Sequence, residues 1–299
     1  MYPEIHFWNP KTSSLHKELV YGEKWLRFSY ENRLGRVGLW AFVKRSWFSK
    51  WYGARMNSSK SRQKILPFIS KYDLDQEEFL KPVSSFKSFN EFFFRELKPQ
   101  SRPIDEAESS IVYPADGRHL VIPDLSQVST LYVKGQSFDL KSLFESGKEA
   151  NFYGEGSMLI SRLCPVDYHR FHFPTSGKIS TATLINGSLL SVSPIALRHN
   201  LSIFWENKRY LSFLQNEHIG KIAQFLVGAT CVGSVHLTAQ QNSHVKKGQE
   251  YGYFSFGGSC VITVFPRHSV QFNQDIMEWS AKGIETYARM GEPVARYMT

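Results

Sequence analysis

Cysteine is scarce in this chain of 299 residues, and its placement argues against two kinds of stabilisation. Three cysteines are present, Cys164, Cys231 and Cys260, and none belongs to a CxxC pair. An odd number of cysteines without such pairs gives no support to a disulfide framework or to structural zinc. The sequence therefore predicts a protein of a reducing compartment that carries no metal site.

Long apolar runs are also missing. No stretch reaches the roughly 18 apolar residues that a membrane-spanning helix needs. The first residues, Met1–His6, lack the basic start and apolar core of a secretory signal. Neither a strand–GxGxxG–helix unit nor a Walker A sequence occurs, so no nucleotide cofactor is indicated. We expect a chain with no spanning helix and no export signal.

Acidic residues are few at the N-terminal end. Residues 1–72 hold fourteen Lys and Arg against four Glu, a net charge of +10, whereas residues 73–299 have a net charge of −1. Basic residues alone would also suit nucleic acid. Tryptophan mixed with Lys and Arg favours an anionic membrane surface, because aromatic rings settle at the level of the headgroups. We therefore expect membrane contact and no nucleic-acid binding from a segment with five of the seven tryptophans: Trp8, Trp25, Trp40, Trp47 and Trp51.

Residues 24–80 have the pattern of helices. Trp40, Val43, Trp47 and Trp51 recur at the i, i+3, i+4 spacing of one helix face. Such a face either touches lipid or packs on the protein's own core, and the sequence leaves both possibilities open. The segment 1–85 is accordingly interpreted as a basic, helical, membrane-associating region.

From about residue 110 the pattern changes to short strands. Alternating or wholly apolar runs are separated by Gly, Pro, Asn and Asp, which is typical of a β-rich body with mainly antiparallel strands. The predicted fold class is α+β. The helical region 1–85 is followed by a β-rich catalytic domain, 86–299.

Two adjacent glycines interrupt the last long strand pattern, in residues 251–265. Gly257 and Gly258 directly precede Ser259. Glycine weakens a strand and lets another group approach the backbone closely. Taken alone, this pattern is typical of a β-bulge. It also places a serine hydroxyl beside a carbonyl that no Cβ shields, which is what attack of a serine on its own chain requires.

Three segments supply an aspartate, histidines and a serine. Asp116 lies in Pro114–Gly117, His169 and His172 lie in Asp167–Pro174, and Ser259 follows the glycines. A relay needs a serine, an imidazole that accepts its proton and a carboxylate that orients the imidazole. An ordinary serine hydrolase could use the same three groups. A non-enzymatic membrane-binding module, in which the set is a coincidence, is the other alternative.

Taken together, these segments resemble the phosphatidylserine decarboxylase family. The family's Pro-Ala-Asp-Gly element appears at residues 114–117, its Asp-Tyr-His-Arg-x-His-x-Pro element at residues 167–174, and its self-cleaving Gly-Ser at Gly258 and Ser259. The elements occur in family order over about residues 86–280. Cys260 stands where the family usually has threonine or serine, and Gly257 where some members carry leucine or valine.

The resemblance implies a proenzyme that cuts itself. His172, oriented by Asp116, would take the proton of Ser259, and the Ser259 hydroxyl would attack the carbonyl of Gly258 to form an ester. β-Elimination and hydrolysis would then separate a β chain, 1–258, from an α chain, 259–299. The α chain would begin with a pyruvoyl group, a covalent pyruvate cofactor derived from Ser259.

The resemblance also implies the reaction and its setting. The pyruvoyl group would form a Schiff base with the amine of phosphatidylserine, and loss of CO₂ would give phosphatidylethanolamine. His169 is the candidate that protonates the resulting carbanion. Because residues three apart in a strand face opposite ways, a bend or loop is required at this point if His169 and His172 both serve one site. The family further suggests a homodimer, bound peripherally to the cytoplasmic side of the cell membrane.

Overall fold

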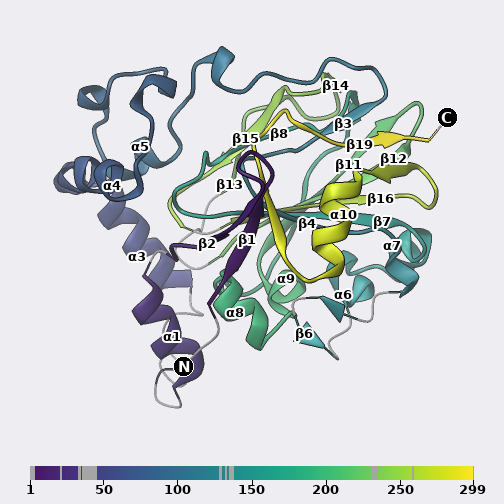
Figure 1. Cartoon of the computed structure of the whole chain (residues 1–299), viewed down its shortest axis with the longest axis horizontal. Coiled ribbons are helices and arrows are strands. Elements are labelled where there is room, and N and C mark those ends of the chain that lie inside the picture. Colours follow the sequence, from purple (N-terminus) through teal and green to yellow (C-terminus); the bar gives the residue numbers. More distant parts are fainter. Residues whose placement is uncertain are drawn as a thin grey trace.

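A large, mainly antiparallel sheet forms the centre of the computed structural model, with helices gathered at one end and along one side (Figure 1). The structure describes residues 4–20, 22–32, 35, 46–127, 130–131, 133–134, 138–229, 235–257 and 259–298. Gly258 and Cys231 lie outside these ranges, as do Trp40, Val43 and the side chain of Trp47. The predicted α+β class is confirmed.

The described strands are β1 (His6–Asn9), β2 (Ser14–Lys17), β3 (Ser110–Val112), β4 (Gly117–Ile122), β5 (Thr130–Leu131), β6 (Val133–Lys134), β7 (Ser157–Leu163), β8 (Arg170–His172), β9 (Gly177–Ile179), β10 (Thr183–Ile185), β11 (Arg209–Asn216), β12 (Gly220–Val227), β13 (Val235–Leu237), β14 (His244–Val245), β15 (Glu250–Phe254), β16 (Ser259–Phe265), β17 (Val270–Phe272), β18 (Glu285–Ala288) and β19 (Pro293–Tyr297). The described α-helices are α1 (Glu23–Glu31), α3 (Ser46–Asn57), α4 (Ile65–Tyr72), α5 (Phe89–Phe93), α6 (Leu140–Phe144), α7 (Gly147–Tyr153), α8 (Pro194–His199), α9 (Ile203–Glu206) and α10 (Gln274–Ala281).

Strand β16 lies inside the large sheet, whose strand order is β14-β9-β11-β12-β16-β7-β4-β18-β1-β2. Each of its residues is buried. Cys260, Ile262 and Val264 enter one core cluster, with side chains of α6, α8 and α9, whereas Val261 and Phe265 enter a second cluster on the other face. Because both faces are covered, the strand reads as a nearly continuous apolar run and does not alternate with polar residues.

Two smaller sheets contribute to the second cluster. One has the order β13-β15-β8 and the other β17-β19-β3. Phe171 and Phe254 of the first sheet and Ile111 and Val294 of the second are buried among the side chains of that cluster. The segment that carries His172 is thereby held against the face of the large sheet.

The N-terminal segment joins the large sheet as a hairpin. Strand β1 pairs in parallel with β18, and β2 pairs with β1. The sequence predicted helices over residues 24–80, and the first described helix begins at Glu23, but the two strands that precede it were not predicted. Four-residue strands offer too little alternation to be recognised, and the partner of β1 lies near the other end of the chain. The N-terminal segment thus contributes two strands to the large sheet, and the division of the chain at residue 85 stays a prediction.

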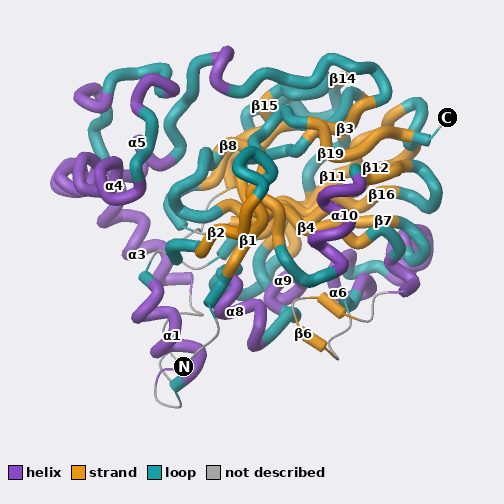
Figure 2. Tube along the Cα trace, in the orientation of Figure 1, coloured by secondary structure: helices purple, strands orange, loops and turns teal. Residues whose placement is uncertain are grey.

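Helices α3, α4 and α5 gather around a cluster of phenylalanines at the left of the molecule, where Figure 2 shows most of the helical tube. Phe68, Phe89, Phe92 and Phe93 are buried there, and the cluster extends to Phe256, three residues before Ser259. The helical region is thus packed directly against the segment that precedes the expected cleavage site. Among the described residues, no helix combines the length and apolarity needed to cross a membrane.

Candidate active site

Ser259 begins β16 and is fully buried. It lies opposite Leu163 of β7 in register. The residue two positions earlier, Gly257, has φ of 137°, a left-handed value that favours glycine over residues with a Cβ. The backbone bends at Phe256 and Gly257, and β16 holds Ser259 in place from its C-terminal side.

The imidazole of His169 faces the hydroxyl of Ser259. Its Nδ1 lies 3.4 Å from Ser259 Oγ, and its Nε2 lies 2.8 Å from the carbonyl oxygen of Cys164. A carbonyl oxygen only accepts hydrogen bonds, so Nε2 carries the ring proton and Nδ1 of the neutral ring is the acceptor. Catalytic hydrogen bonds are often this long before the reacting state forms. The arrangement allows His169 to take a proton from Ser259.

Packing and a tight turn hold His169 in this orientation. Its ring is stacked on Phe93, with centroids 3.8 Å apart. The turn that supplies the Cys164 carbonyl is closed by Asp167, whose carboxylate accepts from the Cys164 N–H and from Arg118. Burial lowers the pKa of His169 to about 3, and the positive charge of Arg95 acts in the same direction. The ring is therefore neutral near pH 7.

Asp116 is buried but points to an arginine. Its carboxylate accepts from Arg102, with Nη2 2.6 Å from Oδ2, and from the backbone N–H of Met290 at 2.9 Å. Among the described residues, no hydrogen bond joins Asp116 to His172. The Asp116 carboxylate, which the sequence suggested as part of a relay, forms an ion pair with Arg102 instead.

The backbone of His172 lies beside the segment that carries Asp116, but the His172 ring makes no hydrogen bond to Asp116 in the described part of the chain. Its backbone N–H donates to the carbonyl of Pro114, at 2.7 Å, which brings β8 beside the Pro114–Gly117 segment. Its Nδ1 is buried without a hydrogen-bond partner among the described residues. Burial, and secondarily Arg170, lower the pKa of His172 to about 3. His169 lies in the loop that precedes β8, whereas His172 is the last residue of that strand.

The thiol beside Ser259 faces away from the site. Cys260 is buried in the core cluster on the opposite face from its neighbour Val261. Successive side chains of a strand point to opposite faces, so Cys260 and Ser259 point apart. Burial raises the pKa of Cys260, which keeps it a neutral thiol. The Cys260 thiol therefore does not compete with the Ser259 hydroxyl for the base.

A cavity of about 360 Å³ adjoins the turn that orients His169. Val166, Asp167 and Tyr168 form part of its wall, and Asp116 and Arg95 line it as well. Sequence reasoning missed Phe93, Arg95 and the Cys164 carbonyl. The run of three phenylalanines followed by arginine, residues 92–95, was the available signal, since a charge directly after an apolar helix face needs a partner.

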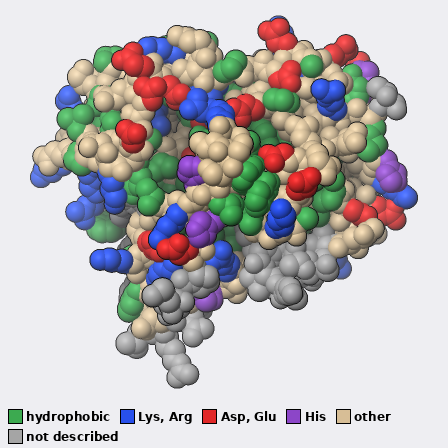
Figure 3. All heavy atoms as spheres, in the orientation of Figure 1, with side chains coloured by type: hydrophobic (Ala, Val, Ile, Leu, Met, Phe, Trp, Pro, Cys, Tyr) green, Lys and Arg blue, Asp and Glu red, His purple; other side chains and the backbone are tan. Residues whose placement is uncertain are grey.

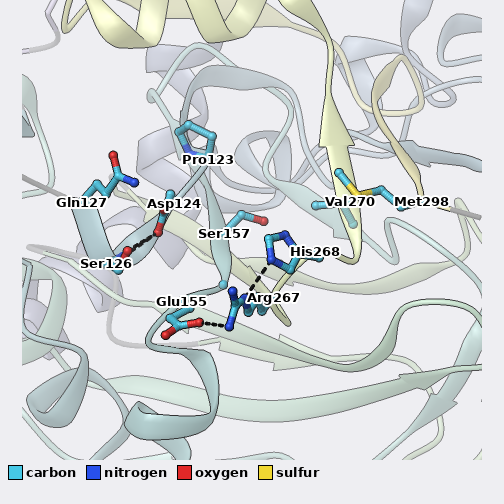
Figure 4. A pocket seen from close by; sticks show the side chains of 11 residues that line it. Pro123, Asp124, Ser126, Gln127, Glu155, Ser157, Arg267, His268, Val270 and Met298 are labelled. Carbon is cyan, nitrogen blue, oxygen red and sulfur yellow. Dashed lines mark hydrogen bonds and ion pairs between the residues drawn. The ribbon is translucent and has the colours of Figure 1, made fainter.

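A second pocket of similar volume lies at the far end of the same strands (Figure 4). Ser157 and Gly156 of its wall lie at the start of β7, where Ser157 is opposite Phe265, and Arg267 and His268 follow β16. Six residues of strand separate this end from Ser259, about 20 Å. This pocket is therefore not part of the Ser259 site.

A serine hydroxyl that faces a neutral, oriented imidazole inside a closed core is the arrangement with which enzymes activate a hydroxyl. The comparisons with known proteins specify its kind. The family model described as phosphatidylserine decarboxylase matches residues 89–296. The phosphatidylserine decarboxylase proenzyme of Fusobacterium nucleatum is 43% identical over 291 residues, 97% of each chain.

Two further relatives give the same result. The proenzyme of that name from Chlamydia muridarum is 43% identical over 98% of this chain and 97% of its own, and that from Clostridium perfringens is 40% identical over 97% and 99%. The chain belongs to the phosphatidylserine decarboxylase family. This membership confirms the predicted enzyme class, a decarboxylase of phospholipid biosynthesis.

Proposed function

We propose that this chain is made as a proenzyme that cuts itself between Gly258 and Ser259, and that the resulting enzyme converts phosphatidylserine to phosphatidylethanolamine. The observation that carries the proposal is the contact between Ser259 Oγ and the unprotonated Nδ1 of His169. The three relatives described above are named as proenzymes, which agrees with a chain that must be processed. The products are a β chain, 1–258, and an α chain, 259–299, that remain together.

Self-cleavage needs a group that removes the Ser259 proton. In the geometry described above, His169 is the imidazole that touches this hydroxyl, and its Nε2–H is anchored on Cys164. The resemblance assigns the same task to His172, oriented by Asp116. For that relay to form, Asp116 must turn from Arg102 toward His172, whose Nδ1 has no partner among the described residues. We retain the Asp116–His172 relay as a proposal and add His169 as the direct contact.

The environment of Ser259 fits a covalent pyruvoyl group. The group contains fewer atoms than the serine from which it forms, so the closed space around residue 259 accommodates it. Strand β16 is bonded to β12 and β7 on its two edges, so the new chain end stays in place after cleavage. When present, a pyruvoyl group supplies a carbonyl for the substrate amine and an acceptor for the electron pair that CO₂ leaves.

Within this site, His169 has a second proposed task. Its Nδ1 is directed at residue 259 and is neutral at physiological pH, so it can hold a proton taken up there and return it to a nearby carbon atom. The stacking on Phe93 keeps the ring from swinging away between the two steps. Burial of the whole segment excludes bulk water from the reacting atoms.

We also propose that exposed aromatic and basic side chains of the N-terminal helices rest on an anionic membrane. Trp25 and Phe28, three residues apart on α1, are 45% and 52% exposed, and Trp51 of α3 and Leu66 of α4 are also exposed. Figure 3 shows Lys and Arg side chains gathered over the α4 region at the left of the visible face. The proposed setting is a homodimer, peripherally bound on the cytoplasmic side of the cell membrane.

The decisive experiment is an intact-mass measurement of the purified protein. The proposal requires two fragments, the smaller spanning the 41 residues 259–299, with a pyruvoyl group at its N-terminus. An active preparation that consists of one uncut chain with a serine at 259 would overturn it. The serine-hydrolase alternative requires that uncut chain and a covalent adduct with serine-directed reagents.

A further inference from the structure

Arg95 is a buried arginine with donors that lack acceptors. It follows α5 and is only 6% exposed. Its guanidinium carbon lies 4.9 Å from the ring centroids of both Phe79 and Phe92. Nε and Nη1 are buried and have no hydrogen-bond partner among the described residues. A buried charged group whose donors lack acceptors lowers the stability of the fold, unless an anion accepts those hydrogen bonds.

The side chain of Arg95 lines the cavity beside the active site. Four arginines line it, and three of them have carboxylate partners within the described part of the chain: Arg102 with Asp116 and Glu78, Arg118 with Asp167, and Arg289 with Glu78. For Arg95 the structure shows no such partner. The other lining charges, Lys17, Asp73 and Asp75, are exposed at the rim. The interior of the cavity therefore has one positive charge more than its carboxylates neutralise.

The same cavity is continuous with the elements that orient the catalytic histidine. Its wall includes Val166–Tyr168, which connect the Cys164 turn to His169. Arg95 is two residues beyond Phe93, on which the His169 ring is stacked. The charge of Arg95 acts on the His169 ring, and that ring contacts Ser259, so an anion held by Arg95 would lie near a substrate bound at residue 259. Apolar lining by Phe7, Leu19 and Leu74 suits the glycerol and first acyl carbons of a lipid.

We propose that Arg95 binds the phosphodiester of the phospholipid headgroup and so positions the substrate's serine moiety at residue 259. This inference rests on the proposed function. A planar guanidinium offers paired donors that match two phosphate oxygens. The headgroup carboxylate is the other anion available. It must lose its charge as CO₂ leaves, and an arginine on it would stabilise the substrate more than the transition state. The phosphodiester keeps its charge throughout the reaction.

The test compares Arg95→Gln with Arg267→Gln, which removes the same charge at the far end of β16, where Arg267 pairs with Glu155. Both proteins are first checked for self-cleavage by intact mass. The KM and kcat for a short-chain, soluble phosphatidylserine are then measured. The inhibition constant of glycerophosphoethanolamine, which has the phosphodiester but no carboxylate, is measured alongside.

We expect Arg95→Gln to be cleaved and to raise both KM and the inhibition constant about 10- to 100-fold, with a much smaller change in kcat, because the lost contact is the same in substrate and transition state. Arg267→Gln should match the unsubstituted enzyme. A raised KM with an unchanged inhibition constant would mean that Arg95 binds the carboxylate of the substrate headgroup, and would overturn the proposal. So would an unchanged KM, or a loss confined to kcat.

A second measurement covers the case in which Arg95→Gln does not fold or is not cleaved. In the unsubstituted enzyme, phenylglyoxal labels accessible arginines that lack ion-pair partners, and peptide mass mapping reads each site. Protection of Arg95 by glycerophosphoethanolamine supports the proposal. Labelling that this compound does not change contradicts it, and so does the absence of any labelling of Arg95 in the free enzyme, because a cavity that admits a phosphodiester headgroup also admits the reagent. An unsubstituted chain that is never cleaved would instead refute the proposed function, so the two failures are distinguishable.

Discussion

The carboxylate of Glu18, near the N-terminus, accepts hydrogen bonds from the guanidinium of Arg162, on the strand beside β16. Nη2 of Arg162 lies 2.6 Å from Glu18 Oε2 and 2.6 Å from Glu285 Oε2, and all three side chains are buried. Arg162 is also the register partner of Cys260, next to Ser259. The N-terminal segment is therefore joined to the catalytic sheet by charge as well as by strand pairing.

Replacing Glu18 should destabilise the protein more than its position near the chain end suggests. Glu18→Gln leaves Arg162 with one carboxylate, and loss of one member of a buried ion pair costs about 3 kcal/mol. Thermal unfolding measured at pH 7 should show a clearly lower midpoint. Glu4→Gln, which removes a carboxylate from the exposed pair with Lys17, is the matched control and should leave the midpoint nearly unchanged.

The same pair predicts an acid dependence of stability. Burial acts to raise the pKa of Glu18, but the charges of Arg162 and Arg118 and the hydrogen bonds from Arg162 and Cys164 together outweigh it and lower the pKa from 4.5 to about 2. A carboxylate with a lowered pKa stabilises the fold above its unfolded pKa, and this contribution is lost as the pH falls from about 4.5 to about 2. Denaturant unfolding of Glu18→Gln across this range should show a smaller acid-dependent loss than the unsubstituted chain. Parallel curves for the two proteins would contradict the assignment.

Self-cleavage should depend on Ser259 and not on its neighbour Cys260. Ser259→Ala removes the attacking oxygen and should yield an uncut, inactive chain of full mass. Cys260→Ser should still be cut, because the Cys260 side chain points into the core on the other face of the sheet. Electrophoresis and intact-mass measurement show whether each variant is cut or uncut. Cleaved protein should also react with hydroxylamine, a carbonyl reagent; an uncut Cys260→Ser protein that is otherwise folded would implicate the thiol.

Substitutions of His169 and of His172 should affect the rate of self-cleavage differently. Self-cleavage needs a proton acceptor, and loss of a general base typically reduces a rate by about 10²- to 10⁴-fold. If the contact in the uncleaved chain governs this step, His169→Gln should slow cleavage by that amount. If Asp116 and His172 form the relay, His172→Gln and Asp116→Asn should slow it instead, and His169→Gln should be cut normally but fail to decarboxylate. The time course of precursor loss after synthesis measures each variant.

The pKa of His169 gives this experiment a pH prediction. A ring with a pKa of about 3 is neutral, and therefore able to accept a proton, at every pH well above 3. The cleavage rate of the unsubstituted chain should then be level between about pH 5 and pH 8. A rate that rises steeply around pH 6.5 would indicate a histidine with an ordinary pKa as the base.

Membrane binding should depend on exposed aromatics of α1. Trp25→Ala together with Phe28→Ala removes two large apolar groups without disturbing the buried Leu26 and Tyr30 of the same helix. Because each such group contributes about 1.5–3 kcal/mol when fully buried in an apolar phase, binding to anionic vesicles should weaken by at least about tenfold. Phe152→Ala, an equally exposed ring on α7, is the control. Equal vesicle binding by all three proteins would contradict this contact.

Point substitutions are preferable here to removal of residues 1–72. The deletion would take away β1, β2 and Glu18, and with them one edge of the large sheet and a partner of Arg162. Any loss of binding would then reflect a damaged fold. The structure thus changes how the proposed membrane contact of the N-terminal region must be tested.

The local sequence determined the chemistry-bearing elements and the general class of the fold. Alternating apolar runs between turn residues predicted a mainly antiparallel body, and the ordered segments around Asp116, His169 and Ser259 identified the family. These features depend on residues close together in the chain. Propensity, turn formation and motif spacing are all expressed over such short separations.

Only the tertiary structure decided which groups meet. The pairing of β1 with β18 and the contact of Glu18 with Arg162 join segments more than a hundred residues apart, and no local pattern encodes them. Asp116 is bound to Arg102 and His169 faces Ser259 because packing of α5 and β8 on the large sheet sets those distances. The sequence identified the candidate reactive residues, whereas three-dimensional packing and burial set their partners, their protonation states and the cavity beside them.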